Sequence, residues 1–271
     1  MKPKTISENM MYNTVRLEAH SGSTGTGFFY NFKVDDIVYP AIVTNQHVVN
    51  YKQVEKIKFI FHLIKDEHNY DENILAEYIT EWIFHPTKDL CICLINPIFE
   101  DIKRKTGKAP FYIVNDDSIV ATQEKLNELS ALEELVMVGY PIGLFDNRNN
   151  FPIFRKGYTA SHPAHDFNEE GIGLADIACF PGSSGSPIFI LNENGFTDRN
   201  GTHHIGQPRI ILLGILYAGP CYDAKGNIKE VEIPTKQEIQ TTIPIMTNLG
   251  SYIKATELKY FENYIRENNI K

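Results

Sequence analysis

Residues 14–34 read Thr-Val-Arg-Leu-Glu-Ala-His-Ser-Gly-Ser-Thr-Gly-Thr-Gly-Phe-Phe-Tyr-Asn-Phe-Lys-Val. The first six residues alternate between polar and apolar side chains, which is the period of a β-strand that buries one face. A turn rich in Gly, Ser and Thr follows at residues 21–27, and residues 28–34 return to the two-residue period. This stretch therefore predicts two β-strands joined by a turn near the start of the chain.

The same strand signal recurs along the rest of the chain. Further strand candidates are 37–44, 57–64, 77–84, 90–95, 135–138, 153–158, 172–179, 187–191, 210–217 and 239–246. Many short strands separated by turns predict an all-β sandwich or barrel. Two segments have helical spacing instead. Residues 122–134 predict a short helix or turn between two halves of the chain, and residues 251–268 predict an amphipathic C-terminal helix packed on a barrel.

Composition and charge narrow the class of protein. The chain has 271 residues, 42% of them hydrophobic, with 26 Lys and Arg against 34 Asp and Glu, for a formal net charge of -8. An acidic chain is a poor partner for nucleic acid, because phosphates are neutralised by clustered Lys and Arg. A polar N-terminus and the lack of an apolar run of about 18 residues predict neither a signal peptide nor a membrane span.

The number and spacing of the cysteines indicate the redox state of the cellular compartment. The four cysteines, Cys91, Cys93, Cys179 and Cys221, are too few and too irregularly spaced for a disulfide framework, and no C-x-x-C motif is present. They are expected to be reduced core residues of a cytoplasmic protein. The sequence implies no cofactor and no metal.

Two polar motifs stand at strand boundaries. Residues 41–49 form an apolar strand that ends in Thr-Asn-Gln and then presents His47, and in residues 85–95 Asp89 stands at the mouth of a strongly apolar strand. Alone, each is weak evidence, since a lone histidine is usually a satisfied core residue and a lone aspartate a turn or cap residue.

A third motif, Phe-Pro-Gly-Ser-Ser-Gly-Ser-Pro-Ile-Phe at residues 180–189, packs small residues into a turn that leads into a strand. Glycines on both sides of Ser184 allow the backbone to curl, so that its N–H groups converge on one point and form a nest suited to an oxyanion. Alone, this pattern is also weak, because Gly/Ser clusters usually mark ordinary loops.

Taken in the order His47, Asp89 and Ser184, the three motifs resemble those of the chymotrypsin-like serine peptidases. The resemblance is nearest to bacterial trypsin-like peptidases such as the glutamyl endopeptidases and the high-temperature-requirement proteases. It covers most of the chain, in segments 25–28, 44–47, 89–90, 139–143, 182–187 and 214–219. The resemblance implies a mainly β fold of two antiparallel Greek-key β-barrels with a C-terminal α-helix.

The resemblance also implies how the chain is divided. Residues 1–115 would form the first barrel, which carries His47 and Asp89, and residues 116–134 the crossover between barrels. Residues 135–248 would form the second barrel, which carries Ser184, and residues 249–271 the terminal helix. The site would then lie between the two barrels, a common position for active sites.

A serine endopeptidase that works through an acyl-enzyme is the function that the resemblance implies. Ser184 would attack the scissile carbonyl, His47 would take and return the proton, and Asp89 would orient the imidazole. The backbone N–H groups of Gly182 and Ser184 would bind the oxyanion. The substrate would be a protein or peptide.

Substrate contacts are implied at two places. The edge formed by Tyr217, Ala218 and Gly219 would pair with the substrate backbone as an added strand. A pocket walled by Ala178, Cys179 and Leu216 contains no charge, which favours a small or apolar residue before the cleaved bond. No basic residue placed in this wall supports the preference of the glutamyl endopeptidases for glutamate.

Regulation and two alternatives remain open. A permanently formed site would be hazardous in the cytoplasm, so a regulatory protein partner or the substrate is expected to switch the loops at 139–150 and 182–184. One alternative is a catalytically silent peptide-binding module of the same family. The other takes His162, His165 and Asp166 as the metal site of a hydrolase, although no second ligand cluster stands near them in sequence.

Overall fold

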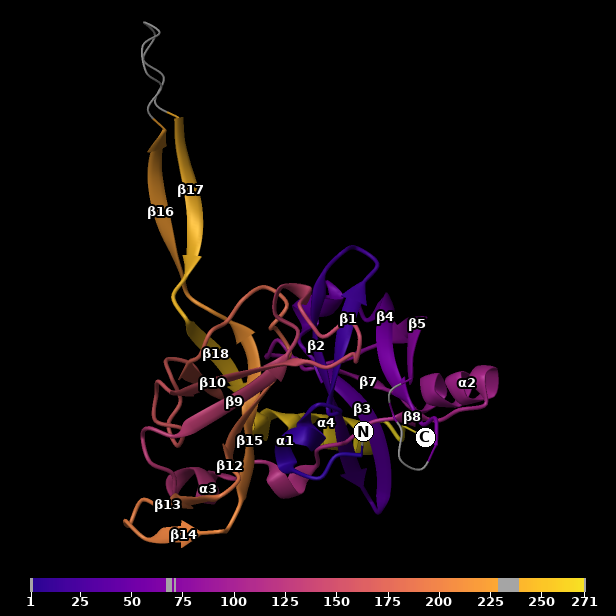
Figure 1. The fold of residues 1–271 in the computed structure, drawn as a ribbon, viewed down its shortest axis with the longest axis horizontal. Coiled ribbons are helices and arrows are strands. Elements are labelled where there is room, and N and C mark those ends of the chain that lie inside the picture. Colours follow the sequence, from indigo (N-terminus) through magenta and orange to yellow (C-terminus); the bar gives the residue numbers. More distant parts are fainter. Residues whose placement is uncertain (1, 67–69, 71, 229–238, 271) are drawn as a thin grey trace, which may run out of the picture.

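The computed structural model describes residues 2–66, 70, 72–228 and 239–270. Two β-units lie against each other, and a long two-stranded hairpin projects away from both (Figure 1). The fold is mainly β, with a curled sheet, a closed barrel and a C-terminal helix, so the predicted fold class is confirmed.

The first unit is an antiparallel sheet of eight strands. In chain order, they are β1 Thr14–Ala19, β2 Thr24–Val34, β3 Ile37–Thr44, β4 Val54–Leu63, β5 Glu72–Glu81, β6 Ile83–Phe84, β7 Cys91–Leu94 and β8 Pro110–Phe111. The strands pair in the order β5-β4-β1-β2-β3-β7-β6, and β8 pairs with β4. The alternation noted in β1 is structural, because Val15, Leu17 and Ala19 are all buried in the core of this unit.

The second unit is a closed six-stranded barrel with the strand order β10-β11-β18-β15-β12-β9. Its strands are β9 Glu134–Gly139, β10 Ile153–Thr159, β11 Ile172–Asp176, β12 Pro187–Asn192, β15 Arg209–Ala218 and β18 Leu249–Lys254. Leu135, Ile188 and Tyr252 are fully or almost fully buried within it. A separate apolar cluster joins the two units, with Phe28 contributed by the first and Phe189 by the second.

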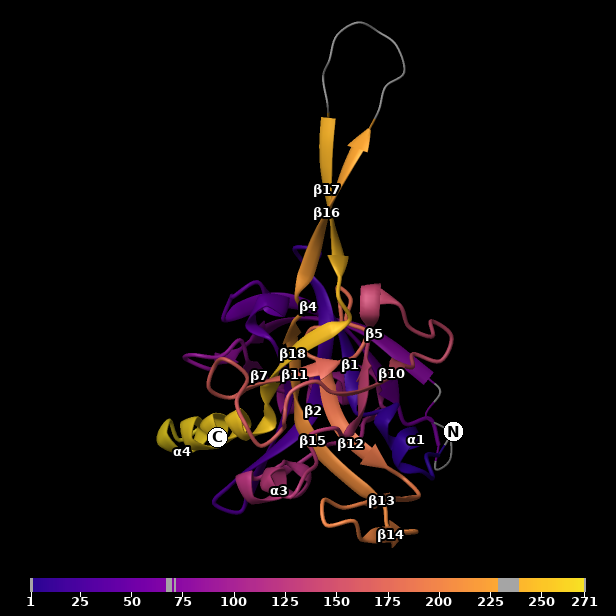
Figure 2. The same cartoon turned by 90° about the vertical axis from the view of Figure 1, so that its left-hand side faces the viewer.

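Two hairpins lie outside the barrel. One joins β13 Gly195–Thr197 to β14 His203–Ile205, and the other joins β16 Cys221–Ile228 to β17 Ile239–Met246. The second hairpin stands clear of the body in both views (Figure 2). The strand predicted at 239–246 is therefore confirmed, but among the described strands it pairs with β16 and not with the barrel.

Short helices connect and cover the strands. They are α1 Ile6–Met10, α2 Asn96–Thr106, α3 Gln123–Asn127 and α4 Lys259–Glu267, together with the 3-10 turns η1 Gln46–Val49, η2 Asp117–Ile119, η3 Pro141–Gly143 and η4 Ala255–Leu258. The sequence analysis missed α2. None of the helices in the described part of the chain is long and apolar enough to cross a membrane.

One helix prediction is wrong in its first third. The helix expected from 251, in a segment taken to begin at 249, starts only at Lys259, because Leu249–Lys254 is the strand that closes the barrel between β11 and β15. Tyr252 packs inside the barrel, while Ile253 joins the cluster between the two units. A strand buried on both faces loses its polar alternation, and its apolar pair then fits a helical pattern.

Candidate active site

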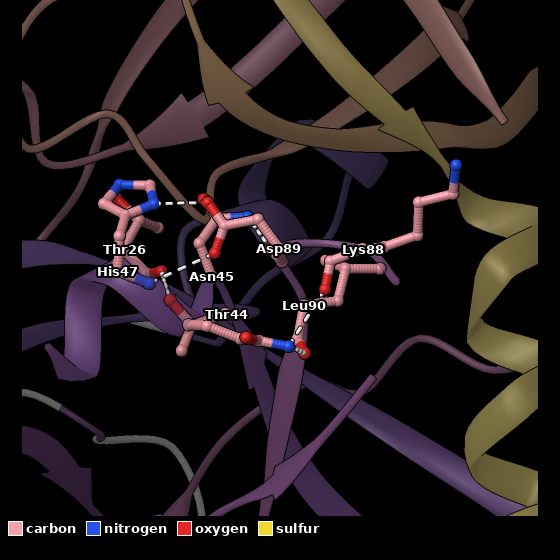
Figure 3. A network of polar contacts seen from close by, with 8 residues as sticks. Thr26, Thr44, Asn45, His47, Lys88, Asp89 and Leu90 are labelled. Atoms are coloured by element: carbon pink, nitrogen blue, oxygen red, sulfur yellow. Dashed lines mark hydrogen bonds and ion pairs between the residues drawn. The ribbon is translucent and has the colours of Figure 1, made fainter. Parts of the chain in front are cut away.

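His47 and Asp89 are brought together by two turns of the first unit. His47 lies in η1, immediately after β3, and Asp89 lies in the turn before β7. The Nδ1 atom of His47 is 2.5 Å from Oδ2 of Asp89, and the backbone N–H of His47 donates to Oδ1 at 3.1 Å (Figure 3). Both carboxylate oxygens thus bind one residue. His47 remains 31% exposed, so that the other ring nitrogen can be reached by a substrate or nucleophile.

The turn that carries Asp89 is held by the two residues that precede His47. Asn45 Nδ2 donates to the carbonyl oxygen of Asp89 at 2.7 Å. Gln46 Nε2 lies 2.7, 2.9 and 3.0 Å from the carbonyl oxygens of His85, Lys88 and Leu90. The motif around His47 therefore supplies the histidine and also the side chains that position its carboxylate. The sequence analysis quoted Asn45 and Gln46 but assigned them no role.

Ser184 stands in a turn that only glycine can form at two positions. Gly182 and Gly185 have φ angles of +88° and +84°, which side chains with a Cβ rarely adopt. A Cβ on Gly185 would lie 1.9 Å from the carbonyl oxygen of Thr26, and one on Gly182 would lie 2.7 Å from that of Tyr140. The turn is thus pressed against neighbouring backbone on both sides of Ser184.

The backbone N–H groups of Gly182 and Ser184 donate to no residue in the described part of the chain. The carbonyl oxygen of Pro181 accepts a hydrogen bond from the backbone N–H of Ile142. In a trans peptide the C=O and N–H groups point in opposite directions, so this contact turns the N–H of Gly182 away from Ile142. Two unengaged donors beside a serine can bind a developing oxyanion.

The serine turn is tied to the histidine segment through Thr26 of β2. The N–H of Thr26 donates to the carbonyl oxygen of Ser184 at 2.8 Å, and Thr44 Oγ1 donates to the carbonyl oxygen of Thr26 at 2.7 Å. Thr44 ends β3, three residues before His47. Ser184 Oγ makes no hydrogen bond to any described residue, and catalytic contacts of this kind often tighten only in the substrate complex.

A pocket of about 210 Å³ opens beside Ser184. Its lining residues are Cys179, Phe180, Pro181, Ser184, Leu216, Tyr217, Ala218 and Gly219. The structure thus brings five of the six expected substrate-binding residues together with Ser184, whereas Ala178 is not among the described residues of this lining. Burial raises the pKa of the Cys179 thiol to about 11, so this wall is neutral. Phe180 and Pro181 were missed, although they directly precede the glycine turn.

A cation stands behind one wall of the pocket. The guanidinium carbon of Arg155, in β10, lies 4.8 Å from the centre of the Phe180 ring, within the range of a cation–π contact. The sequence analysis placed no basic residue near this wall, because Arg155 is distant in sequence from every residue that lines the pocket. The antiparallel pairing of β10 with β11, the strand that precedes Phe180, brings Arg155 to this ring.

His162, His165 and Asp166, the residues of the alternative metal site, make other contacts in the structure. Asp166 Oδ1 is 2.7 Å from Lys254 Nζ, and this contact lowers the pKa of the Asp166 carboxyl. The rings of His162 and His165 lie 5.2 Å apart, centre to centre. Within the described ranges, no three or more His, Cys, Asp or Glu side chains form a group that could hold a metal ion. The metal-site alternative therefore gains no ligand set.

Both a protein-family model and a set of solved structures match this chain. The model of the trypsin-like peptidase domain family matches residues 25–195, which is more than half of the chain and includes His47, Asp89 and Ser184. No curated protein matches. Among the 131 solved chains that match is a human pathogenic astrovirus serine protease, with 12% identity and a TM-score of 0.41 over 90% of this chain and 91% of that chain.

Proposed function

This chain belongs to the trypsin-like peptidase domain family, and we propose that it is a serine endopeptidase that cleaves protein or peptide substrates through an acyl-enzyme intermediate. The observation that carries the proposal is the contact of both Asp89 oxygens with His47, at 2.5 and 3.1 Å. A carboxylate bound in this way keeps the proton on Nδ1 and leaves Nε2 free to act as a base.

In the proposed mechanism, His47 Nε2 takes the proton of Ser184 Oγ as the oxygen attacks the scissile carbonyl. Asp89 stabilises the imidazolium that forms, and His47 then gives the proton to the leaving amine. The N–H groups of Gly182 and Ser184 bind the oxyanion, and each such donor contributes about 3 to 4 kcal/mol in serine peptidases. Water then hydrolyses the acyl-enzyme by the same route.

Substrate binding is proposed along the end of β15. The backbone of residues 217–219 would pair with an extended substrate as an added strand, which supplies affinity with little dependence on side chains. The pocket lined by Cys179 and Leu216 would take a small or apolar side chain. Its modest volume and neutral inner wall support this preference.

The proposal also covers which part of the chain supplies each part of the site and how the activity is regulated. Residues 1–115 would supply the base and carboxylate, residues 116–134 the crossover, and residues 135–248 the nucleophile. A regulatory protein partner or the substrate would act on the loop at 139–150. Ile142 and Leu144 of that loop are 69% and 61% exposed, which supports contact with another protein.

The cellular compartment of the protein and its subfamily are also proposals. Cys91, Cys93 and Cys179 are buried and free, which supports a reducing compartment such as the cytoplasm. The net charge of -8 supports a role without nucleic acid or membrane partners. Kinship with the glutamyl endopeptidases or high-temperature-requirement proteases rests on the motifs alone.

Labelling with a fluorophosphonate probe tests the function. We expect the wild-type chain to be labelled at Ser184, Ser184→Ala to lose all labelling and His47→Ala to lose most of it. Ser23→Ala, a change in a turn outside the site, is the matched control and should be labelled like wild type. A folded wild-type chain that stays unlabelled both alone and with cell extract would contradict the proposal.

The alternative is a catalytically silent peptide-binding module. The absence of a hydrogen bond from Ser184 Oγ to any described residue favours it. Such a module would bind peptides along residues 217–219 yet resist the probe even after incubation with cell extract. Labelling that appears only with extract would instead support a peptidase that requires a partner.

A further inference from the structure

We propose that Thr26 is a positioning residue, whose hydroxyl holds the Gly182–Ser184 segment so that its free N–H groups face the substrate. The inference rests on the proposed function, because it concerns the oxyanion donors of the same site. Thr26 lies in β2 of the first unit, whereas these donors belong to the second. A side chain of the first unit would thus control the oxyanion-binding half of the site, which is built on the second unit.

Every polar group of Thr26 is engaged, although the residue is completely buried. Its N–H donates to the carbonyl oxygen of Ser184 at 2.8 Å, and its own carbonyl oxygen accepts from Thr44 Oγ1 at 2.7 Å. Its hydroxyl donates to the carbonyl oxygen of Gly182 at 3.1 Å and accepts from the N–H of Tyr140 at 3.0 Å. Three segments of the chain therefore converge on this residue.

The direction of the Thr26 hydroxyl proton is set by these partners. A backbone N–H can only donate, so Tyr140 uses the acceptor side of the hydroxyl, and the proton points to the carbonyl oxygen of Gly182. Room around the hydroxyl is limited, since a Cβ on Gly139 would lie 2.7 Å from Thr26 Oγ1. The contact is thus directional and closely packed.

The nucleophile turn is held at three successive carbonyl oxygens. Pro181 accepts from the N–H of Ile142, Gly182 accepts from the Thr26 hydroxyl, and Ser183 accepts from the N–H of Ser186 at 3.0 Å. Each carbonyl fixes the N–H of the next residue, because the two groups lie in one trans peptide plane. The carbonyls of Pro181 and Ser183 therefore orient the N–H groups of Gly182 and Ser184. The carbonyl of Gly182 belongs to the peptide plane that lies between these two groups.

Of these three contacts, the one from Thr26 comes from a side chain, so a substitution can remove it without altering the backbone. Without the hydroxyl, the carbonyl of Gly182 loses its partner in a buried position, which is unfavourable. The plane between Gly182 and Ser183 then keeps only the hydrogen bond from the N–H of Ser183 to the carbonyl oxygen of Phe180, and the freedom of glycine at φ +88° allows this plane to rotate. Such a rotation would turn the N–H groups of Gly182 and Ser184 away from the position of the oxyanion.

Thr26→Val tests this idea, because valine keeps the shape and removes the hydroxyl. We expect kcat for a fluorogenic peptide with alanine before the scissile bond to fall by about 10- to 100-fold, below the 10²–10³ of a fully lost donor. KM should change less than about twofold, since the contact acts in the transition state. Thr26→Ser restores the hydroxyl and should recover most of the activity.

Thr24→Val is the matched control, because Thr24 lies on the same strand face two residues earlier and is only partly buried. It should behave as wild type. Equal kcat in wild type and Thr26→Val would overturn the inference, as would a Thr26→Ser variant as impaired as Thr26→Val. If Thr26→Val does not fold, Thr26→Ala takes its place in the same comparison.

Amide hydrogen exchange of residues 180–186, read by mass spectrometry, separates this inference from the proposed function. Exchange should be faster in Thr26→Val than in wild type, Thr26→Ser and Thr24→Val, whether or not the chain has activity. A wild type that resists the probe even with cell extract would contradict the peptidase proposal, while the exchange result would still decide the role of Thr26. Equal exchange in all four proteins would overturn that role.

Discussion

The two halves of the candidate site are built in different ways. Around His47, side chains make the decisive contacts: the carboxylate of Asp89 binds the imidazole, and the amide of Gln46 holds the turn that carries Asp89. Around Ser184, the backbone makes them: glycines allow the turn, and the carbonyl of Pro181 and the N–H of Ile142 fix it against a neighbouring loop. Thr26 is the side chain that crosses between the halves.

This difference bears on both sequence analysis and regulation. A side-chain site requires particular residues at particular positions, which the sequence displays. A backbone site requires only freedom of φ and a close neighbour, and its geometry depends on how that neighbour is placed. The histidine half should therefore respond to changes of chemical groups, and the serine half to changes of backbone freedom.

Asp89→Asn should produce the largest effect. The amide cannot stabilise the imidazolium and can hold the ring in the wrong tautomer, so kcat should fall on the order of 10⁴-fold at neutral pH, the size of this effect in serine peptidase triads. Peptide hydrolysis measures it. Asp36→Asn, at an exposed carboxylate outside the site, is the control. A loss smaller than tenfold would mean that Asp89 does not serve His47.

Gly182→Ala should produce an intermediate effect. The new Cβ meets the carbonyl oxygen of Tyr140 at 2.7 Å and adds strain at φ +88°, which displaces the N–H of Gly182. We expect kcat to fall by about 10²- to 10³-fold, with little change in KM. Gly22→Ala separates strain from contact, because Gly22 has φ +91° but no atom within 4 Å of its Cβ position. Similar activity in Gly182→Ala and Gly22→Ala would show that the backbone of the Ser184 turn does not control activity.

The pH dependence of stability should show the smallest effect. His85, whose carbonyl Gln46 binds, is buried, and burial followed by the charge of Lys88 lowers its pKa. Below about pH 6.5 the unfolded chain therefore takes up a proton that the folded chain refuses. The stability contributed by neutral His85 is complete above that pH and is lost as the pH falls through the folded pKa.

His85→Asn should reduce this dependence, because asparagine keeps an acceptor for the turn but does not titrate. Denaturant unfolding at about pH 7.5 and about pH 5.5 measures it, and one proton changes the slope by at most about 1.4 kcal/mol per pH unit. Glu257, whose pKa is raised by burial, has Oε2 3.5 Å from Nε2 of His85, so the difference between the proteins measures His85 together with this contact. Identical slopes would show that His85 does not couple the turn to pH.

The fold was predictable where burial is one-sided. The strand at 14–19 follows the alternation of its residues, since Val15, Leu17 and Ala19 face the core while Arg16 and Glu18 are only partly buried. Prediction failed at Leu249–Lys254, which is buried on both faces and was taken for helix. The projecting β16–β17 hairpin was recognised only as a strand, because nothing in its sequence says which strand it will pair with.

The same division applies to the site. His47, Asp89 and Ser184 were identified from motifs, and the pocket residues Cys179 and Leu216 from the family resemblance. Arg155 was not, because only the pairing of β10 with β11 brings it to Phe180. Thr26 was quoted as part of a strand motif, but four contacts with distant segments define its place, and no local pattern contains them.

By itself, the sequence determined the β class, the family motifs and the chemical groups available for reaction, because these depend on side-chain type and local period. Tertiary structure decided which strand closes the barrel, which cation stands behind the pocket and how the peptide planes of Gly182–Ser184 are turned. Each of these outcomes depends on contacts between residues far apart in the chain. Such contacts form only when the strands of the barrel pair and the two units pack on each other, and they leave no periodic trace in the sequence.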